Sequence, residues 1–193
     1  MANVSTEQAT EKNRETIAQY VSDMAALESH IEEALDRQLK EVVGEPIALA
    51  AVQEFHDTVK RHRDSLRDEV DNLGVPVGGT IKAVGSALLG KAAGLIDLVR
   101  SEGTAKSLRD DYAAFSLAAI GYSMLHTTSL SLGNTRIASL AERHLQDQAN
   151  MIMRINEIMP DVVVKELKED GLQVEKGAAS STRKVVAEAW KSK

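Results

Sequence analysis

The stretch KEVVGEPIAL, residues 40–49, predicts a sharp turn between two helices. Gly44 is suited to ending a helix, because glycine adopts the left-handed backbone conformation at little cost. Pro46 is suited to the first turn of the next helix, where its missing N–H is not needed. Two helices joined by so short a connection must lie antiparallel and side by side. The predicted fold starts from this hairpin.

The two helices that flank this turn carry apolar side chains at helical spacing. The first helix is predicted from about Lys12 to the turn, and the second from Pro46 to about Leu73, where glycines and Pro76 break it. His62 occupies a position in the second stripe where an aliphatic side chain is expected. The apolar positions are Ile17, Val21, Met24, Ile31, Leu35 and Val42, then Val52, Phe55, Val59, Leu66, Val70 and Leu73.

A second pair of helices follows later in the chain. One is predicted from about Ala105 to Leu132 and the next from the turn LGNT, residues 132–135, to Pro160. Asn134 or Thr135 can cap the later helix, because both side chains accept hydrogen bonds from free N–H groups at a helix start. The stripes consist of Tyr112, Phe115, Ala119, Tyr122 and His126, then Ile137, Ala141, Gln148, Ile152 and Ile155.

The segment between the two hairpins, residues 79–100, reads GTIKAVGSALLGKAAGLIDLVR. Apolar residues share one face, which predicts a crossover helix that lies across a bundle. Lys82, Lys91 and Asp97 argue against a membrane span. A helix on a membrane surface is the alternative, although the polar face of this segment carries few cations.

The sequence therefore predicts an all-α fold: an antiparallel four-helix bundle with one long crossover. Residues 1–11 are expected to form a flexible tail, residues 12–160 the bundle, and residues 161–193 a C-terminal extension with short amphipathic helices. The apolar residues around Trp190 can dock on this chain or on a partner.

Composition and charge narrow the function classes. The chain has 193 residues, of which 43% are hydrophobic and 3% aromatic, so its core must be aliphatic. It has no cysteine, which excludes disulfides and thiolate chemistry. A net charge of −6 argues against nucleic acid as a partner. The polar N-terminus shows no secretory signal, so a cytoplasmic protein is expected.

A polar layer is predicted near the middle of the bundle. Glu28 and His62 lie at nearly equal distances along the chain from the first turn, so they fall at one height. The same counting from the second turn brings Gln148 to this height, with Asp147 beside it and Phe115 and alanines opposite. Tyr122, His126 and His144 are expected to lie closer to that turn.

Three stretches carry a resemblance to a known family: SDMAALESHIEEAL (22–35), HRDSLRDEVDNLGV (62–75), and GYSML with AERHLQDQANM (121–125 and 141–151). They resemble ferritin-like bundles, in particular the bacterial stress-associated YciE/YciF-type ferritin-like family, over residues 17–156. The resemblance implies a four-helix bundle with a crossover and a di-metal centre of Glu and His ligands.

Carried over to this chain, the resemblance places the metal ligands of the first two helices on Glu28 and His62. The carboxylates of the third helix fall near Phe115 and Ala118, and the acidic pair of the fourth falls near Asp147 and Gln148. A di-iron centre needs more carboxylates to offset its charge. We therefore expect a hydrogen-bonded polar pair of His62 with Glu28 or Gln148. The alternative is one iron or manganese ion on Glu28, His62 and Asp147.

Three functions follow as hypotheses. The first is a non-enzymatic, self-associating bundle without a cofactor, a homo-oligomer whose bacterial and stress-related setting is implied by the resemblance alone. The second is a metal-binding protein of oxidoreductase type. The third is an adaptor that binds a lipid surface or a protein partner through residues 79–100 and the tail around Trp190.

Overall fold

The computed structural model describes residues 2–41, 45–75 and 103–191, and these parts of the chain contain helices and short connections but no strand. The helices are α1 (Ala2–Glu41), α2 (Pro46–Leu73), α4 (Thr104–Ser131), α5 (Thr135–Glu169) and α6 (Ala178–Ala189). The predicted all-α class is confirmed for the described residues.

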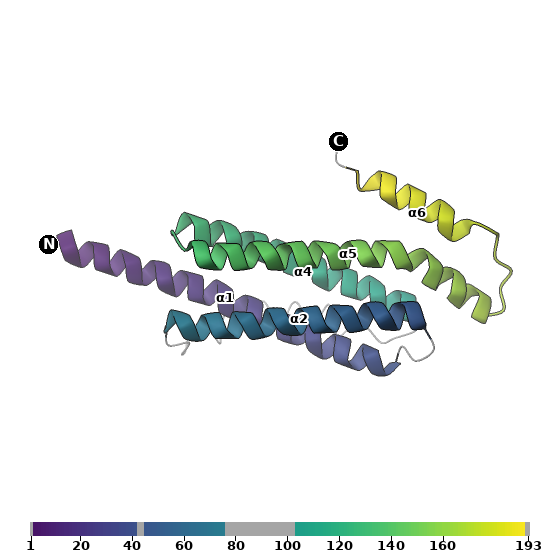
Figure 1. The fold of residues 1–193 in the computed structure, drawn as a ribbon, viewed down its shortest axis with the longest axis horizontal. Helices are drawn as coiled ribbons and strands as arrows, with labels where there is room; N and C mark the ends of the chain where they lie inside the picture. The colour runs from purple at the N-terminus through teal and green to yellow at the C-terminus, as the bar shows by residue number, and fades with distance from the viewer. Residues whose placement is uncertain (1, 42–44, 76–102, 192–193) are drawn as a thin grey trace.

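Four long helices form a bundle-like arrangement of two antiparallel hairpins (Figure 1). In sequence order, α1 pairs with α2 and α4 pairs with α5, while α1 also packs on α4 and α2 on α5. Helices α2 and α4 run in the same direction, and Leu73 and Thr104 lie at opposite ends of the bundle. The connection between the hairpins is thus a crossover, while the predicted helix at 79–100 lies outside the described residues.

The core is built from the apolar stripes of the four helices. On α1 and α2 the predicted stripe positions are buried, except that Val70 is only partly buried and Val42 lies outside the described residues. On α4 the buried face is rotated from the prediction: Leu108, Ala118 and Leu125 are fully buried, while Ala119 and His126 are only partly buried. The reason is that α4 has uncharged side chains on several faces, so its sequence periodicity does not single out one of them. An edge-to-face contact between Phe55 and Phe115, with ring centroids 5.2 Å apart, joins the two hairpins.

Two predicted boundaries are wrong. Helix α1 begins at Ala2 instead of near Lys12, because no Pro or Gly precedes Gly44 to interrupt it. Helix α5 continues through Pro160 to Glu169. One proline removes one backbone hydrogen bond and bends a helix without always ending it, and α5 bends near this end (Figure 1).

Other predicted helix ends are confirmed. Asn134 is the N-cap of α5, and its Oδ1 accepts a hydrogen bond from the backbone N–H of Ile137 at 3.1 Å. Gly74 follows α2 in the left-handed conformation, with φ 61°.

The C-terminal helix α6 lies against α5. Arg183 forms an ion pair with Asp161 of α5, and the ring of Trp190 lies edge-on to Tyr112 with centroids 6.4 Å apart. No residue of α6 is buried. Of the helices that the structure describes, none has the length and apolar character needed to cross a bilayer.

Candidate functional site

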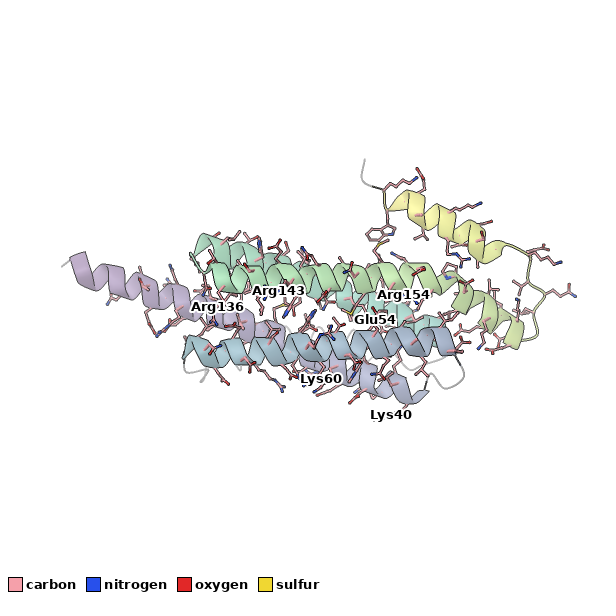
Figure 2. All side chains as sticks on the ribbon, viewed as in Figure 1. Lys40, Glu54, Lys60, Arg136, Arg143 and Arg154 are labelled. Atoms are coloured by element: carbon pink, nitrogen blue, oxygen red, sulfur yellow. The ribbon has the colours of Figure 1, made fainter. Side chains whose placement is uncertain are left out.

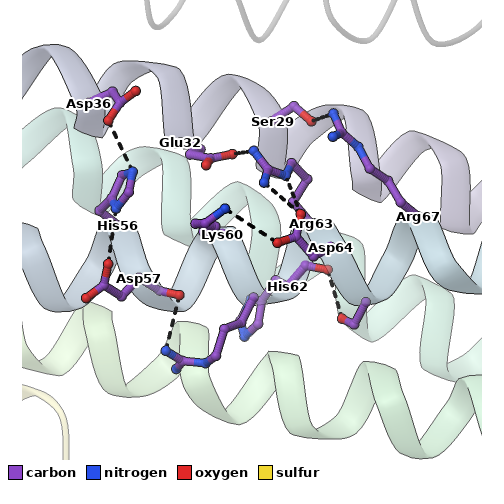
Figure 3. Close-up of polar contacts among 12 residues, drawn as sticks. Ser29, Glu32, Asp36, His56, Asp57, Lys60, His62, Arg63, Asp64 and Arg67 are labelled. Carbon is purple, nitrogen blue, oxygen red and sulfur yellow. Dashed lines mark hydrogen bonds and ion pairs between the residues drawn. The ribbon is translucent and has the colours of Figure 1, made fainter.

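A polar cluster lies in the middle of the bundle, where side chains from all four long helices meet. Long charged side chains such as Lys40 and Lys60 project from the outside of the bundle (Figure 2). His62 points inward from α2, away from the outer ion pair of Arg63 with Glu32 (Figure 3). The cluster consists of Glu28 on α1, His62 and Ser65 on α2, Tyr122 on α4, and His144, Asp147 and Gln148 on α5.

The imidazole of His62 lies between two carboxylates. Its Nδ1 is 3.2 Å from Oε1 of Glu28, and its Nε2 is 3.1 Å from Oδ2 of Asp147. Glu28 and His62 are buried, whereas the Asp147 side chain is 45% exposed. Burial lowers the pKa of His62, but the hydrogen bonds and charges of Glu28 and Asp147 outweigh this effect and raise it. We therefore assign His62 as an imidazolium that donates from both nitrogens.

One oxygen of Glu28 accepts three hydrogen bonds. Besides His62, the Tyr122 hydroxyl donates to Oε1 at 2.6 Å and Nε2 of Gln148 donates to it at 2.9 Å. Burial and then the charge and hydrogen bond of Glu28 hold the pKa of Tyr122 well above its ordinary value, so the phenol stays protonated. Glu28 is thus a buried anion with one cation and two neutral donors around it.

His144 extends the cluster toward α2. Its ring stacks on His62 with centroids 3.9 Å apart and an angle of 14° between the planes. Burial, and then the charges of His62 and Arg143, lower the pKa of His144 to about 3, so this ring is neutral. Because Tyr122 gives its proton to Glu28, Nδ1 of His144, 3.1 Å away, donates to the Tyr122 oxygen.

The tautomer of His144 determines the role of Ser65. With the proton on Nδ1, Nε2 of His144 is an acceptor, and it lies 3.2 Å from the Ser65 hydroxyl. This hydroxyl also lies 2.9 Å from the backbone carbonyl of His62, so its single proton serves one acceptor at a time. The result is a directed chain of hydrogen bonds from Ser65 through His144 and Tyr122 to Glu28.

The structure confirms part of the predicted layer and corrects the rest. It brings Glu28, His62, Asp147 and Gln148 together, as the counting from the two turns predicted. Tyr122 and His144 join this layer, although they were expected nearer the second turn, whereas His126 is not among the residues of the cluster. Long helical side chains lean toward the N-terminus and reach a neighbouring turn.

A signal for the missed residues is present in the sequence. His144 precedes Gln148 by four positions, and Ser65 follows His62 by three. Residues three or four apart share a helix face, so each lies one turn from a predicted member of the layer.

The residues of the cluster do not fit a di-iron centre. In α4, Phe115 and Ala118 stand where the resemblance places carboxylates. The two nitrogens of His62 point in opposite directions, so Glu28 and Asp147 lie on opposite sides of the ring. Across the described ranges, no group of three His, Asp or Glu side chains is arranged to hold a metal ion. Binding of a single ion stays a prediction, and the buried Oε2 of Glu28, which has no hydrogen-bond partner, is the free acceptor nearest to such a role.

A groove leads from the surface to the cluster between α2 and α5. It has a volume of about 320 Å³, and Asp147 is part of its wall. The lining of the groove contains three acidic side chains and one cation, Arg61. Solvent therefore reaches Asp147, while His62 stays buried behind it. The lining residues are Glu54, Asp57, Thr58, Arg61, Asp147, Asn150 and Met151.

Comparisons with known proteins give information about the fold of this chain only. No protein-family model matches the chain. No curated protein matches its sequence either. A crystal structure of a protein from Xanthomonas campestris pv. campestris is similar, with a TM-score of 0.67 and 16% identity, over 83% of this chain and 99% of that one. Fold and site together define an all-α, bundle-like protein with a buried, hydrogen-bonded polar centre.

Proposed function

We propose that this protein is a ferritin-like bundle in which a hydrogen-bonded polar cluster replaces a di-iron centre. In this proposal it acts by self-association and not by catalysis. The bacterial, stress-related setting comes from the resemblance of its sequence to the YciE/YciF-type family, and a cytoplasmic location is part of the proposal.

The arrangement of the helices supports the ferritin-like part of the proposal. Two antiparallel hairpins joined by one crossover are the topology of ferritin-like bundles, whose ligands project inward near mid-bundle. Glu28 and His62 lie at this height on α1 and α2. This support comes from the path of the chain: α2 and α4 run in the same direction, so a crossover must join the two hairpins.

The main support for the proposed loss of the metal is the charge balance of the cluster. Glu28, the His62 imidazolium and Asp147 leave about one negative charge, and Tyr122 and His144 are neutral. Two iron ions bring four or more positive charges, which a buried site must neutralise with several carboxylates. The imidazolium of His62 occupies the place of a cation between the two carboxylates.

A second candidate function is binding of one divalent ion. It is favoured by the contact of Glu28, His62 and Asp147 and by the unpartnered oxygen of Glu28. Such an ion would displace the proton on one nitrogen of His62.

Metal analysis decides between the two candidates. The protein is purified without chelators from cells supplied with iron and manganese, alongside Glu28→Gln/His62→Gln and the control His126→Gln, which removes an imidazole outside the cluster. We expect less than about a tenth of an equivalent of metal in all three. A stoichiometric ion in the wild type and the control, lost in the double variant, would establish the second candidate.

Sedimentation over a dilution series tests the association. We expect a dimer or larger assembly at concentrations of about 1 to 100 µM. A strict monomer over this range would contradict the proposed function, whatever the metal content.

A further inference from the structure

The contacts that hold the C-terminal helix α6 on the bundle lie close to the surface. No residue of α6 is buried, and Val185 and Trp190 are 68% and 52% exposed. Arg183 of α6 pairs with Asp161 of α5, but these side chains are 38% and 47% exposed, so solvent screens the pair. Trp190 meets Tyr112 of α4 edge-on. A segment with so little buried surface opens at a free energy well below that of global unfolding.

The helical state of α6 depends on this contact. The helix has 12 residues, a length at which an isolated helix in water is marginal. Its N-cap is Gly177, which offers no side-chain acceptor to the free N–H groups. Gly171, near the end of α5, and Gly177 both have positive φ, 77° and 83°, so the connection between them can change direction at little cost. Undocking of α6 and loss of its helix are therefore one event.

The docked helix covers an apolar strip on the last part of α5 (Figure 1). We call it the α5 strip, and it consists of Met159, Pro160, Val163, Val164 and Leu167. A cavity of about 280 Å³ lies between this strip and α6, so the cover is loosely packed. Val163 and Leu167 are still 38% and 37% exposed with α6 in place. Release of α6 would join these side chains into one exposed apolar patch, the kind of surface that marks an interaction site.

The two segments carry opposite net charges. Residues 157–170, at the end of α5, contain five acidic side chains and two lysines. Residues 176–191, which include α6, contain four cations and one acidic side chain. Salt screens exposed charges over about 10 Å at 0.1 M. The attraction that favours docking of α6 therefore weakens as ionic strength rises.

We propose that α6 is a detachable strap: in the intact protein it undocks from α5 as a unit and uncovers the α5 strip. The docked helix occupies the strip, so an apolar ligand for this surface binds only the undocked fraction of the protein. The occupant in the closed state is α6 itself, which the structure shows in place through Arg183 and Val186. Both sides of the contact belong to one chain, so the inference does not depend on the proposed self-association.

Amide hydrogen exchange of the full-length protein measures undocking directly. We expect the amides of α6 to exchange at least about 100-fold faster than the slowest amides of α2, yet more slowly than in an unstructured peptide of the same sequence. Raising the salt concentration should speed the exchange of α6 and leave that of α2 unchanged.

Reversing the ion pair tests what holds the strap. Arg183→Glu places two carboxylates in contact, so exchange of α6 should become about fivefold faster. Adding Asp161→Arg rebuilds the pair in reverse and should return the rate close to that of the wild type. Arg154→Glu is the matched control, because Arg154 pairs with Glu157 within α5 and is also 38% exposed; exchange of α6 should not become faster in it.

Trp190, the one tryptophan of the chain, reports the same event by fluorescence. Arg183→Glu should increase the quenching of Trp190 by acrylamide, because its ring leaves Tyr112 on undocking. An uncharged apolar dye such as Nile red should bind more strongly to this variant. Adding Val163→Ser and Leu167→Ser should remove the gain in dye binding, which would locate the dye on the α5 strip.

Four results would overturn the inference. One is exchange of α6 as slow as that of the bundle, which would make α6 a fixed part of the fold. Another is exchange as fast as in the unstructured peptide, which would mean that no docked state exists. The third is a rate that does not change in Arg183→Glu or is not restored by the reversed pair. The fourth is quenching of wild-type Trp190 that changes on dilution, which would assign the contacts of α6 to an assembly of several copies.

Discussion

His62 and His144 stack face to face, yet their pKa values move in opposite directions. Two carboxylates contact His62, whereas His144 contacts only neutral groups and the charged ring beside it. With one imidazolium and one neutral imidazole, all four ring nitrogens make hydrogen bonds, and two cations are not placed in contact. The two residues therefore give opposite contributions to stability as pH changes.

The pH dependence of unfolding follows from these shifts. Because the pKa of His62 is raised above 6.5, its stabilisation is complete below that pH and is lost as pH rises through the raised value. Because the pKa of His144 is lowered to about 3, its stabilisation is complete above pH 6.5 and is lost as pH falls toward 3. We expect chemical denaturation to show that the free energy of unfolding changes by at most about 1.4 kcal/mol per pH unit on the acid side and on the alkaline side.

Two single variants separate the contributions of the two histidines on the acid and alkaline sides of the pH profile. His144→Gln should flatten the acid side of the wild-type profile and leave the alkaline side unchanged. His62→Gln should flatten the alkaline side. The same slope in a variant and the wild type would contradict the assigned charge of that residue.

Removing His62 alone should cost more stability than removing it together with Glu28 and the other donors to Glu28. His62→Leu leaves the buried charge of Glu28 without its cation, which we expect to cost about 3–5 kcal/mol. Combining it with Glu28→Leu, Tyr122→Phe and Gln148→Met also removes the charge and its other donors, so part of this loss should return. Urea denaturation measures both variants, and a fourfold variant less stable than the single one would show that the network stabilises the fold.

Asp111 is a buried acidic residue near the start of α4, separate from the central cluster. Burial raises its pKa to about 7, Gln38 lowers it slightly, and the charge of Asp110 raises it. The folded state therefore binds this proton more tightly than the unfolded state, and stability is lost as pH rises from 3.8 to about 7. We expect Asp111→Asn to gain on the order of 1 kcal/mol at pH 8 and nothing at pH 4. Asp110→Asn, in a half-buried pair with Arg109, is the control; equal gains in both would contradict the assignment.

At the scale of elements, helix ends follow local chemistry. Pro46 begins α2, Gly74 follows its end, and Asn134 caps α5, all as the sequence predicted. The exceptions are the start of α1 and the passage of α5 through Pro160. Helix α1 has no Pro or Gly before Gly44 to interrupt it, and in α5 a single proline removes one backbone hydrogen bond without ending the helix.

The N-cap at Asn134 should make a measurable contribution to the stability of the protein. Asn134→Ala removes the hydrogen bond to the N–H of Ile137, so thermal unfolding should show a loss of about 1 kcal/mol. Asn134→Asp keeps an acceptor at this position and should lose little. Equal losses in both variants would assign the effect to the turn instead of the cap.

Helix α4 shows why one element can mislead prediction. From Tyr112 onward, the buried and the outer positions of α4 are both uncharged, so the apolar period alone does not identify the core face. Contacts with α1 and α5 decide which face is inside. The opposite face of α4 stays outside, and Ile120 and Met124 are about half exposed there.

At the scale of the whole molecule, topology brings the cluster together. The crossover connection makes every neighbouring pair of long helices antiparallel, so Glu28 of α1, His62 of α2, Tyr122 of α4 and Gln148 of α5 meet at one height. A buried carboxylate, an imidazolium and a phenol then meet within hydrogen-bonding distance although they are far apart in sequence. In the proposed function, this cluster fixes the register of the four helices.

The sequence by itself determined the helical class, the two hairpins, most helix ends, and the common height of Glu28 and His62. These features depend on backbone hydrogen bonds and apolar repeats within one or two turns, and on counting from a tight turn. Tertiary structure alone decided that Tyr122 and His144 complete the cluster, that the two nitrogens of His62 serve different carboxylates, and which face of α4 is buried. Those outcomes depend on the rotation and spacing of helices about their axes, which the local sequence pattern does not specify.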